Sequence, residues 1–390
     1  MVADIRPGFR GSFPAGHTRW CDTLLFAADD GQHGVELWRS DGTATGTRLL
    51  ADLNAGAAGS TPHGFTALQG RVFFAADDGR LGFQLWATGD AGTQRISAID
   101  NGPRGAMPRQ LTGVGRQLFF TASDPAAGHE LWVSDGTAAG TRRVKDLRPG
   151  PEDGRLSQLV AFRGLLFFVA DDGERGAELW RSDGTEAGTH AVADLRPGPA
   201  GSRPAYLTVQ SDTLFFAADD GRSGVELWRS DGSAAGTRRV KDIRPGPANA
   251  LPSFITAWRG ALWFAATDGE HGVELWRSDG TEAGTTMVRD GVPGAGGSSP
   301  AALAVVDDRL WFAAADGATG SRAWSTDGTA AGTRAEPHPA PPGGLASRFT
   351  AWAGGVALTA GDGRGNERLW WRRPDGRVVL VGAPLEGRLR

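Results

Sequence analysis

The stretch ELWRSDGTEAGT at 178–189 recurs letter for letter at 274–285, and variants of it recur along most of the chain. One tryptophan marks each copy, and these tryptophans are Trp38, Trp86, Trp132, Trp180, Trp228, Trp276, Trp324 and Trp370. Their successive spacings are 46 or 48 residues. A repeat of roughly 40–50 residues indicates stacked supersecondary units and suits the blade of a β-propeller. Because a repeat array can grow as one body, we predict a single domain over residues 1–390.

Each unit contains four segments of strand length, which we name A to D in chain order. In the copy at 253–290 they read SFITAW, ALWFAA, VELWRS and TMVRD, with glycine and aspartate at the turns between them. Such runs without helical periodicity indicate an all-β protein. The connections within a unit are as short as hairpins require, whereas the D–A link to the next unit takes about ten residues. The pattern therefore predicts an all-β, eight-bladed β-propeller with four antiparallel strands per blade.

The B segments carry a second repeated column of bulky residues: Phe26, Phe74, Phe120, Phe168, Phe216, Phe264, Phe312 and Leu358. The residue before each of these is also apolar, and it is aromatic in six of the eight units. Adjacent residues of a strand point to opposite faces of its sheet. We therefore predict that both faces of each blade are buried, with the repeated tryptophans packed between neighbouring blades.

An Asp-Gly pair follows the C segment in six units, at Asp41, Asp135, Asp183, Asp231, Asp279 and Asp327. Aspartate can accept hydrogen bonds from backbone amides just downstream, and glycine accepts a positive φ, so the pair favours a tight C–D turn. The threonines of SDGTxxGT can close the same loop through their hydroxyls. A copied turn indicates a copied hairpin rather than a catalytic loop.

Two segments compete for the last place in the final blade. VADIRPG at 2–8 matches the D strand and link VADLRPG at 192–198, which predicts a strand at 2–6 that helps to close the ring. RVVLVG at 377–382 also reads as the fourth strand of the last blade. The sequence leaves both possibilities open.

The text FAADDGxxGxELWxSDGTxxGT followed by VKDIRPG resembles the ELWxxDGT repeat found in many bacterial, often exported, proteins. The resemblance covers nearly the whole chain, although the units around Trp86, Trp324 and Trp370 depart from it. It implies a repeat β-fold of the propeller kind, and it implies no general activity.

Composition excludes several classes. A net charge of −4 with a pI of about 6.0 argues against a nucleic-acid partner, and no apolar run is long enough for membrane insertion. Cys21 is the only cysteine, so neither an intrachain disulfide nor a thiol metal cluster can form. The start shows no apolar leader, so we expect a cytoplasmic protein if Met1 is the native start, and otherwise an exported protein whose leader was removed. We expect a monomer.

No catalytic signature of the G-x-S-x-G, H-E-x-x-H or Walker type is present, so we expect no cofactor and favour a protein that is not an enzyme. Paired aspartates in the B–C turns could hold calcium, which takes oxygen ligands from flexible loops. These weak candidates are Asp29, Asp30, Asp77, Asp78, Asp171, Asp172, Asp219 and Asp220. Stabilisation of the turn explains the same column.

Hairpin topology puts the D–A links and B–C turns on one face of the disc. The link arginines Arg6, Arg148, Arg196 and Arg244 gather there and could hold an anionic ligand. The end of the A segment varies between units, and its aromatic members Trp20, Phe162, Trp258 and Trp352 could line a pocket. We predict a non-catalytic propeller that binds a small molecule, peptide or glycan on this face near the central channel. A protein-interaction scaffold and an enzyme with a dispersed site are the alternatives.

Overall fold

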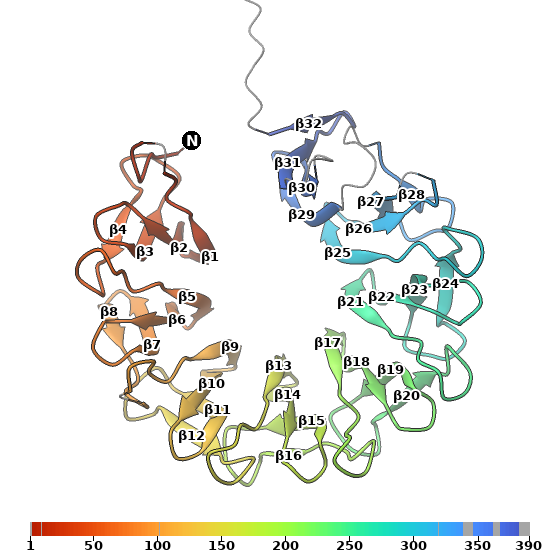
Figure 1. The fold of residues 1–390 in the computed structure, drawn as a ribbon, viewed down its shortest axis with the longest axis horizontal. Coiled ribbons are helices and arrows are strands. Elements are labelled where there is room, and N and C mark those ends of the chain that lie inside the picture. Colours follow the sequence, from red (N-terminus) through yellow and green to blue (C-terminus); the bar gives the residue numbers. More distant parts are fainter. Residues whose placement is uncertain are drawn as a thin grey trace, which may run out of the picture. The chain divides into compact units, whose positions relative to one another are not determined.

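Strands are the regular elements of this chain (Figure 1). A computed structural model describes residues 2–8, 10–100, 102–318, 320–337, 346–361 and 367–381. Within these ranges the structure contains β-strands and no helix. Accordingly, the described part of the chain holds no long apolar helix that could cross a membrane.

The chain divides into two compact units, Met1–Arg203 and Pro204–Arg390, each with four sheets. The strands of the first unit are β1 (Ala15–Trp20), β2 (Thr23–Asp29), β3 (Val35–Ser40), β4 (Arg48–Ala51), β5 (His63–Leu68), β6 (Arg71–Asp77), β7 (Phe83–Gly89), β8 (Gly92–Arg95), β9 (Arg109–Val114), β10 (Gln117–Asp124), β11 (Gly128–Ser134), β12 (Arg142–Lys145), β13 (Ser157–Phe162), β14 (Leu165–Asp171), β15 (Ala177–Ser182) and β16 (His190–Ala191).

The strands of the second unit are β17 (Ala205–Gln210), β18 (Thr213–Asp219), β19 (Val225–Ser230), β20 (Arg238–Lys241), β21 (Ser253–Trp258), β22 (Ala261–Ala266), β23 (Glu274–Ser278), β24 (Thr286–Arg289), β25 (Ala301–Val306), β26 (Arg309–Ala315), β27 (Ser321–Thr326), β28 (Arg334–Ala335), β29 (Ala346–Trp352), β30 (Gly355–Gly361), β31 (Glu367–Arg372) and β32 (Val378–Leu380). That the whole chain is one domain stays a prediction.

Every described sheet has four strands, and each strand pairs antiparallel with its neighbours in chain order. The chain is therefore an all-β propeller of eight blades with four antiparallel strands each, as the repeat predicted. Within each unit the first strands of successive blades are neighbours: β1 lies beside β5, and β17 lies beside β21 (Figure 1). A hydrogen bond from the Thr208 hydroxyl to the Ile255 carbonyl oxygen (2.9 Å) joins this second pair.

Both faces of a blade are buried, as the B segments predicted. In β6, Phe73 packs with Phe120 and Trp132 of the next blade, whereas its neighbour Phe74 packs with Leu37 of the preceding blade. The phenylalanines of the repeated column pair with the repeated tryptophans across the B and C strands, and the Phe120 and Trp132 ring centroids are 6.5 Å apart. The repeated tryptophans from Trp38 to Trp324 are at most 9% exposed. Trp86, Trp132, Trp180, Trp276 and Trp324 pack against residues of the preceding blade.

The SDGTxxGT loops are closed by their own side chains. In the fourth blade Asp183 accepts hydrogen bonds from the Thr185 hydroxyl (2.7 Å) and backbone N–H (2.8 Å), and these bonds hold the pKa of Asp183 below its usual value. Gly184 has a φ of +91°, which favours glycine. A β-carbon on Gly188 would lie 2.1 Å from the Asp183 carboxylate, so the second glycine of the motif is required by contact.

The predicted strand at 2–6 is wrong. Residues 2–8 form no strand, and the fourth strand of the last sheet is β32, which pairs with β31. The N-terminal segment behaves as a link instead: Ile5 packs against Phe26 and Trp38 of the first blade. Its sequence matched a D strand, but the place beside β31, the C strand of the last blade, is taken by β32.

Replacing Trp180 or Trp228 by alanine should lower the free energy of unfolding by about 3–5 kcal/mol, because each change removes a large buried side chain and leaves a cavity. Urea unfolding of the single variants measures the loss. Trp352→Ala is the control, since Trp352 is 46% exposed, and it should cost clearly less. Parental stability of either core variant would contradict the packing assignment.

Candidate functional site

The links that form the predicted binding face are held by a buried glutamate in the C strand. Glu178 of β15 is fully buried. Its carboxylate accepts hydrogen bonds from the backbone N–H groups of Arg196 (3.2 Å) and Ser202 (2.8 Å), and from the Ser202 hydroxyl (2.5 Å). One side chain thus fixes both ends of the link from β16 to β17. A buried carboxylate needs such donors, because an unpaired charge in the interior is costly.

The same position recurs in the neighbouring blades. It holds Glu36, Gln84, Glu130, Glu178, Glu226 and Glu274, which are all buried. Gln84 holds its link with a neutral amide. Its side-chain oxygen accepts from the Ile99 N–H (3.2 Å), and its amide nitrogen donates to the Leu81 carbonyl oxygen (3.0 Å). This column was not among the predicted site residues, although the repeated glutamate of ELW, two residues before a core tryptophan, is a signal for it.

Two of these glutamates lack the hydroxyl partner. In three blades the residue 24 positions after the glutamate is a serine whose hydroxyl donates to it; these serines are Ser60, Ser202 and Ser298. At the same distance from Glu130 and Glu226 the chain has Gly154 and Ala250, which carry no hydroxyl. The Oε1 atom of Glu130 is buried without a hydrogen-bond partner. Burial raises the pKa of Glu130 and of Glu226 to about 7, and the nearby carboxylates of Asp146 and Asp242 add to the shift.

The link arginines lie over the B–C turn of the blade that follows. A β-carbon added to Gly31, Gly173 or Gly269 would lie 2.8–3.3 Å from the Nε atom of Arg6, Arg148 or Arg244 respectively. Their charges are engaged locally, since Arg6 pairs with Asp29, Arg148 pairs with Glu152 (3.1 Å) and Arg244 donates to the Asn249 carbonyl oxygen (3.4 Å). Arg196 is half-buried in its own link. Anion binding by these arginines stays a prediction.

The predicted aromatic residues lie at the far end of the same strands. Trp20, Phe162, Trp258 and Trp352 are the last residues of β1, β13, β21 and β29. Phe162 and Trp258 are buried, and Trp20 donates from its indole to the Gly70 carbonyl oxygen of the next blade (2.9 Å). A six-residue strand separates them from the links by about 17 Å. The structure therefore does not bring these aromatic residues and the arginines of their links into one small site.

A different column varies at the link end of the first strands. One residue near the start of each first strand has a positive φ of 51–70°, beside an irregularity in the strand pairing. These residues are Gly16, Gly64, Gln110, Gln158, Tyr206, Phe254, Ala302 and Arg348. Tyr206 and Phe254 are 39% and 40% exposed, and their ring centroids lie 6.0 Å apart. Sequence reasoning missed them because a bulge shifts the alternation of a strand.

The paired aspartates of the B–C turns cap those turns. The carboxylate of Asp29 accepts from the Gly31 N–H (2.6 Å), and that of Asp30 accepts from the Gln32 and His33 N–H groups (2.8 and 2.9 Å). Burial opposes ionisation of Asp30, yet these N–H groups hold its pKa below the usual value. Among the described residues, no three His, Cys, Asp or Glu side chains gather as a metal site requires.

His129 contacts two side-chain hydroxyl groups, as the base of a catalytic pair would. Its Nδ1 lies 3.1 Å from the Ser123 hydroxyl and its Nε2 lies 2.8 Å from the Thr121 hydroxyl. Asp153 accepts from the His129 backbone N–H (2.8 Å) instead of orienting the ring, and burial lowers the pKa of the imidazole. A nucleophile–base pair needs a base that a third group orients. This arrangement is that of a satisfied histidine within a blade.

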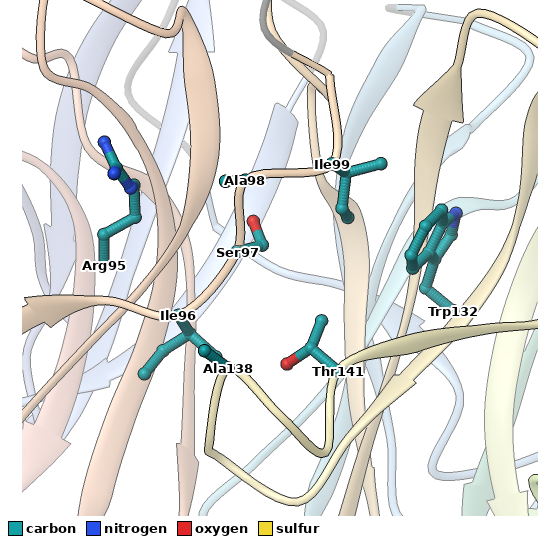
Figure 2. Close-up of a pocket in the computed structure, with 8 residues that line it drawn as sticks. All are labelled: Arg95, Ile96, Ser97, Ala98, Ile99, Trp132, Ala138 and Thr141. Atoms are coloured by element: carbon teal, nitrogen blue, oxygen red, sulfur yellow. The ribbon is translucent and has the colours of Figure 1, made fainter.

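A cavity of about 500 Å³ lies between the second and third blades (Figure 2). One wall is the link that follows β8, with Ser97 and Ile99, and the other is the third blade, with Trp132 and the loop residues Ala138 and Thr141. Figure 2 shows these side chains around a common space. Its volume is in the range of small-molecule sites, which span roughly 300–1,000 Å³.

Comparisons with known proteins show remote likeness only. No protein-family profile matches the chain, and no curated protein matches it. Similar solved structures include the computationally designed Ika8 protein (16% identity over 95% of this chain and 99% of the other, TM-score 0.49). They also include puromycin hydrolase (16%, 97% and 58%, 0.48) and the propeller domain of the Trilobed protease from Pyrococcus furiosus (8%, 96% and 99%, 0.45). The chain spans little more than half of the hydrolase, and likeness at this level assigns no activity.

Stability should fall as pH rises from about 4.5 to 7. With a folded pKa raised from 4.5 to about 7, Glu130 and Glu226 keep protons in the native state that the unfolded chain releases in this window. In the double variant Glu130→Gln/Glu226→Gln this fall should flatten, since Gln84 shows that an amide fits the position. Urea unfolding at pH 5 and pH 8 measures it, with exposed Glu174→Gln as control. An unchanged slope in the double variant would refute the assignment.

Proposed function

We propose that this chain is a non-catalytic binding propeller that holds a small molecule, peptide or glycan against the first strands of its second unit. The observation that carries the proposal is the exposed aromatic pair Tyr206 and Phe254, on adjacent first strands at the link end. Leu251, in the link before β21, is 53% exposed and adds apolar surface. Large aromatic side chains provide contact area at a low cost in side-chain entropy.

The backbone at these two residues is left-handed, as it is at the equivalent position of every blade. Both residues have a left-handed φ, of 58° and 54°, which L-residues adopt at a cost of about 1–2 kcal/mol. The first two blades use Gly16 and Gly64 at this position and avoid that cost. All eight blades share this left-handed φ, so it belongs to the repeated bulge. The exposed aromatic side chains at two of these positions gain little from burial, and they support a functional role.

The variation between blades favours one asymmetric site. A lectin-like array of equal sites would need the same residue in most blades, whereas this position holds glycine, glutamine, tyrosine, phenylalanine, alanine and arginine. A site for one ligand uses a repeated backbone with different side chains. An aromatic platform suits the apolar face of a sugar ring or an apolar side chain of a peptide.

Tyr206→Gly/Phe254→Gly should weaken ligand binding at least tenfold while the protein stays folded, because glycine is the residue that two blades carry there. Oligosaccharide and peptide arrays identify the ligand, and calorimetry then measures the affinity and the number of sites. One site per chain is expected.

Ala302→Gly makes the same backbone change in the next blade without removing an aromatic ring, and it should keep parental affinity. Parental affinity of the double variant would place the ligand elsewhere. Capture of a folded protein partner with no small ligand bound would favour the scaffold alternative.

A further inference from the structure

We propose that the cavity between the second and third blades binds an alkylammonium group, the head of a primary amine such as a lysine side chain or a polyamine. The site is separate from the aromatic pair on the first strands and does not depend on the function proposed for it. The reason lies in how other blades of the same chain fill the equivalent space.

In three blades a cation at the end of the fourth strand crosses onto the tryptophan of the next blade. The Lys145 ammonium lies 5.9 Å from the Trp180 ring centroid and donates to the Thr189 carbonyl oxygen (3.1 Å). Lys241 makes the same pair of contacts with Trp276 (6.0 Å) and Thr285 (2.8 Å), and Arg289 makes them with Trp324 (5.9 Å) and Thr333 (2.6 Å). A ring face and a carbonyl oxygen thus form a repeated cation site between blades.

Strand register identifies Ser97 as the residue of the second blade at this position. Lys145 lies two residues after Arg143, which pairs with the tryptophan of its own blade, Trp132. Ser97 likewise lies two residues after Arg95, which pairs with Trp86. Serine has no chain that could reach the next blade: its hydroxyl accepts from the Leu85 N–H (2.9 Å) and donates to the Gln84 side-chain oxygen (3.0 Å), both in its own blade.

The lining of the cavity supplies the partners of the repeated site. Trp132 and Thr141 are separated by nine residues, as are Trp180 and Thr189, and both line the cavity. Ile96 and Ile99 offer apolar surface to the methylene chain of an amine (Figure 2). An ammonium group entering here meets a ring face in a partly desolvated space, where the attraction is stronger than on an open surface.

The one cation in the lining is already paired. Arg95 donates to the Asp78 carboxylate (2.7 Å), and its counterpart Arg143 pairs with Asp124 (3.4 Å) directly beside Lys145. An arginine–aspartate pair next to the site is therefore compatible with a bound cation. The charge at the rim of the cavity does not exclude an amine.

The first blade shows why a short residue alone does not make this cavity. Ala51 lies two residues after Leu49, which pairs with Trp38. The following blade, however, lacks the SDGTxxGT loop, and Gly89 pairs with Gly92 across a two-residue turn. The second blade thus has no counterpart of the wall that Ala138 and Thr141 form in the third blade. In two other blades the residue equivalent to Ser97 is Ala193 or Pro337.

Calorimetry with n-butylammonium chloride tests the proposal, with n-butanol as the neutral isostere. The amine should bind about tenfold more tightly than the alcohol, as a desolvated cation–π contact predicts. Ser97→Lys places the lysine of the other blades in the cavity and should remove one amine site while the protein stays folded. Gln32→Lys, an exposed change of equal charge, should leave binding unchanged. Equal affinity for amine and alcohol, or intact amine binding in Ser97→Lys, would overturn the proposal.

A variant that should create an additional amine site provides a second test. Lys145→Ser removes the cation above Trp180 and should raise the number of amine sites by one, which no general surface effect would do. Cadaverine and an acetylated lysine amide then separate the two sources of the group: tighter cadaverine binding indicates a free polyamine, and tighter lysine-amide binding indicates a peptide. No added site in a folded Lys145→Ser protein would count against the cation site.

Discussion

Both faces of each blade are apolar, and the rest of the structure depends on this constraint. In β6 the adjacent residues Phe73 and Phe74 point to opposite sides and are both buried. A sheet of this kind cannot face water on either side, so it is stable only between neighbours. The repeated tryptophan then fills the space that two twisted sheets leave between them. Packing of this kind explains why one aromatic column recurs along the chain with so little change.

Packing alone does not hold the links, and the buried glutamates supply that second requirement. A link of about ten residues exposes many backbone N–H groups, and Glu178 satisfies three donors of its link within the blade. The cost is a carboxylate in the interior. Where the serine partner is absent, as beside Glu130, burial shifts the pKa of the carboxyl toward neutrality. Two of the links are thereby anchored by a carboxyl whose pKa is raised to about 7.

Positions that vary between blades carry the candidate sites. Serine at residue 97, where three other blades have a cation, lies beside a cavity, and tyrosine and phenylalanine at residues 206 and 254, where two blades have glycine, form an exposed ring pair. A repeated residue does the same structural work in each blade. Where one blade carries a different residue, the side chain at that position is free to bind a ligand, while the surrounding blades keep the same backbone geometry.

The sequence by itself determined the blade. The spacing of the tryptophans, the paired bulky residues of the B segments and the SDG turns predicted four antiparallel strands per unit and two buried faces, because these features act over a few residues. Only the tertiary structure decided which segment completes the last blade, since 2–6 and 377–382 carry equally good strand text and differ in whether a partner strand lies beside them. It also decided the sites: Phe162 is buried while Phe254 is exposed, and both are aromatic residues of a first strand. Phe254 is exposed because it lies in a left-handed bulge, and the cavity beside Ser97 exists because no side chain reaches from that position to the next blade. Residue type and spacing do not encode either feature.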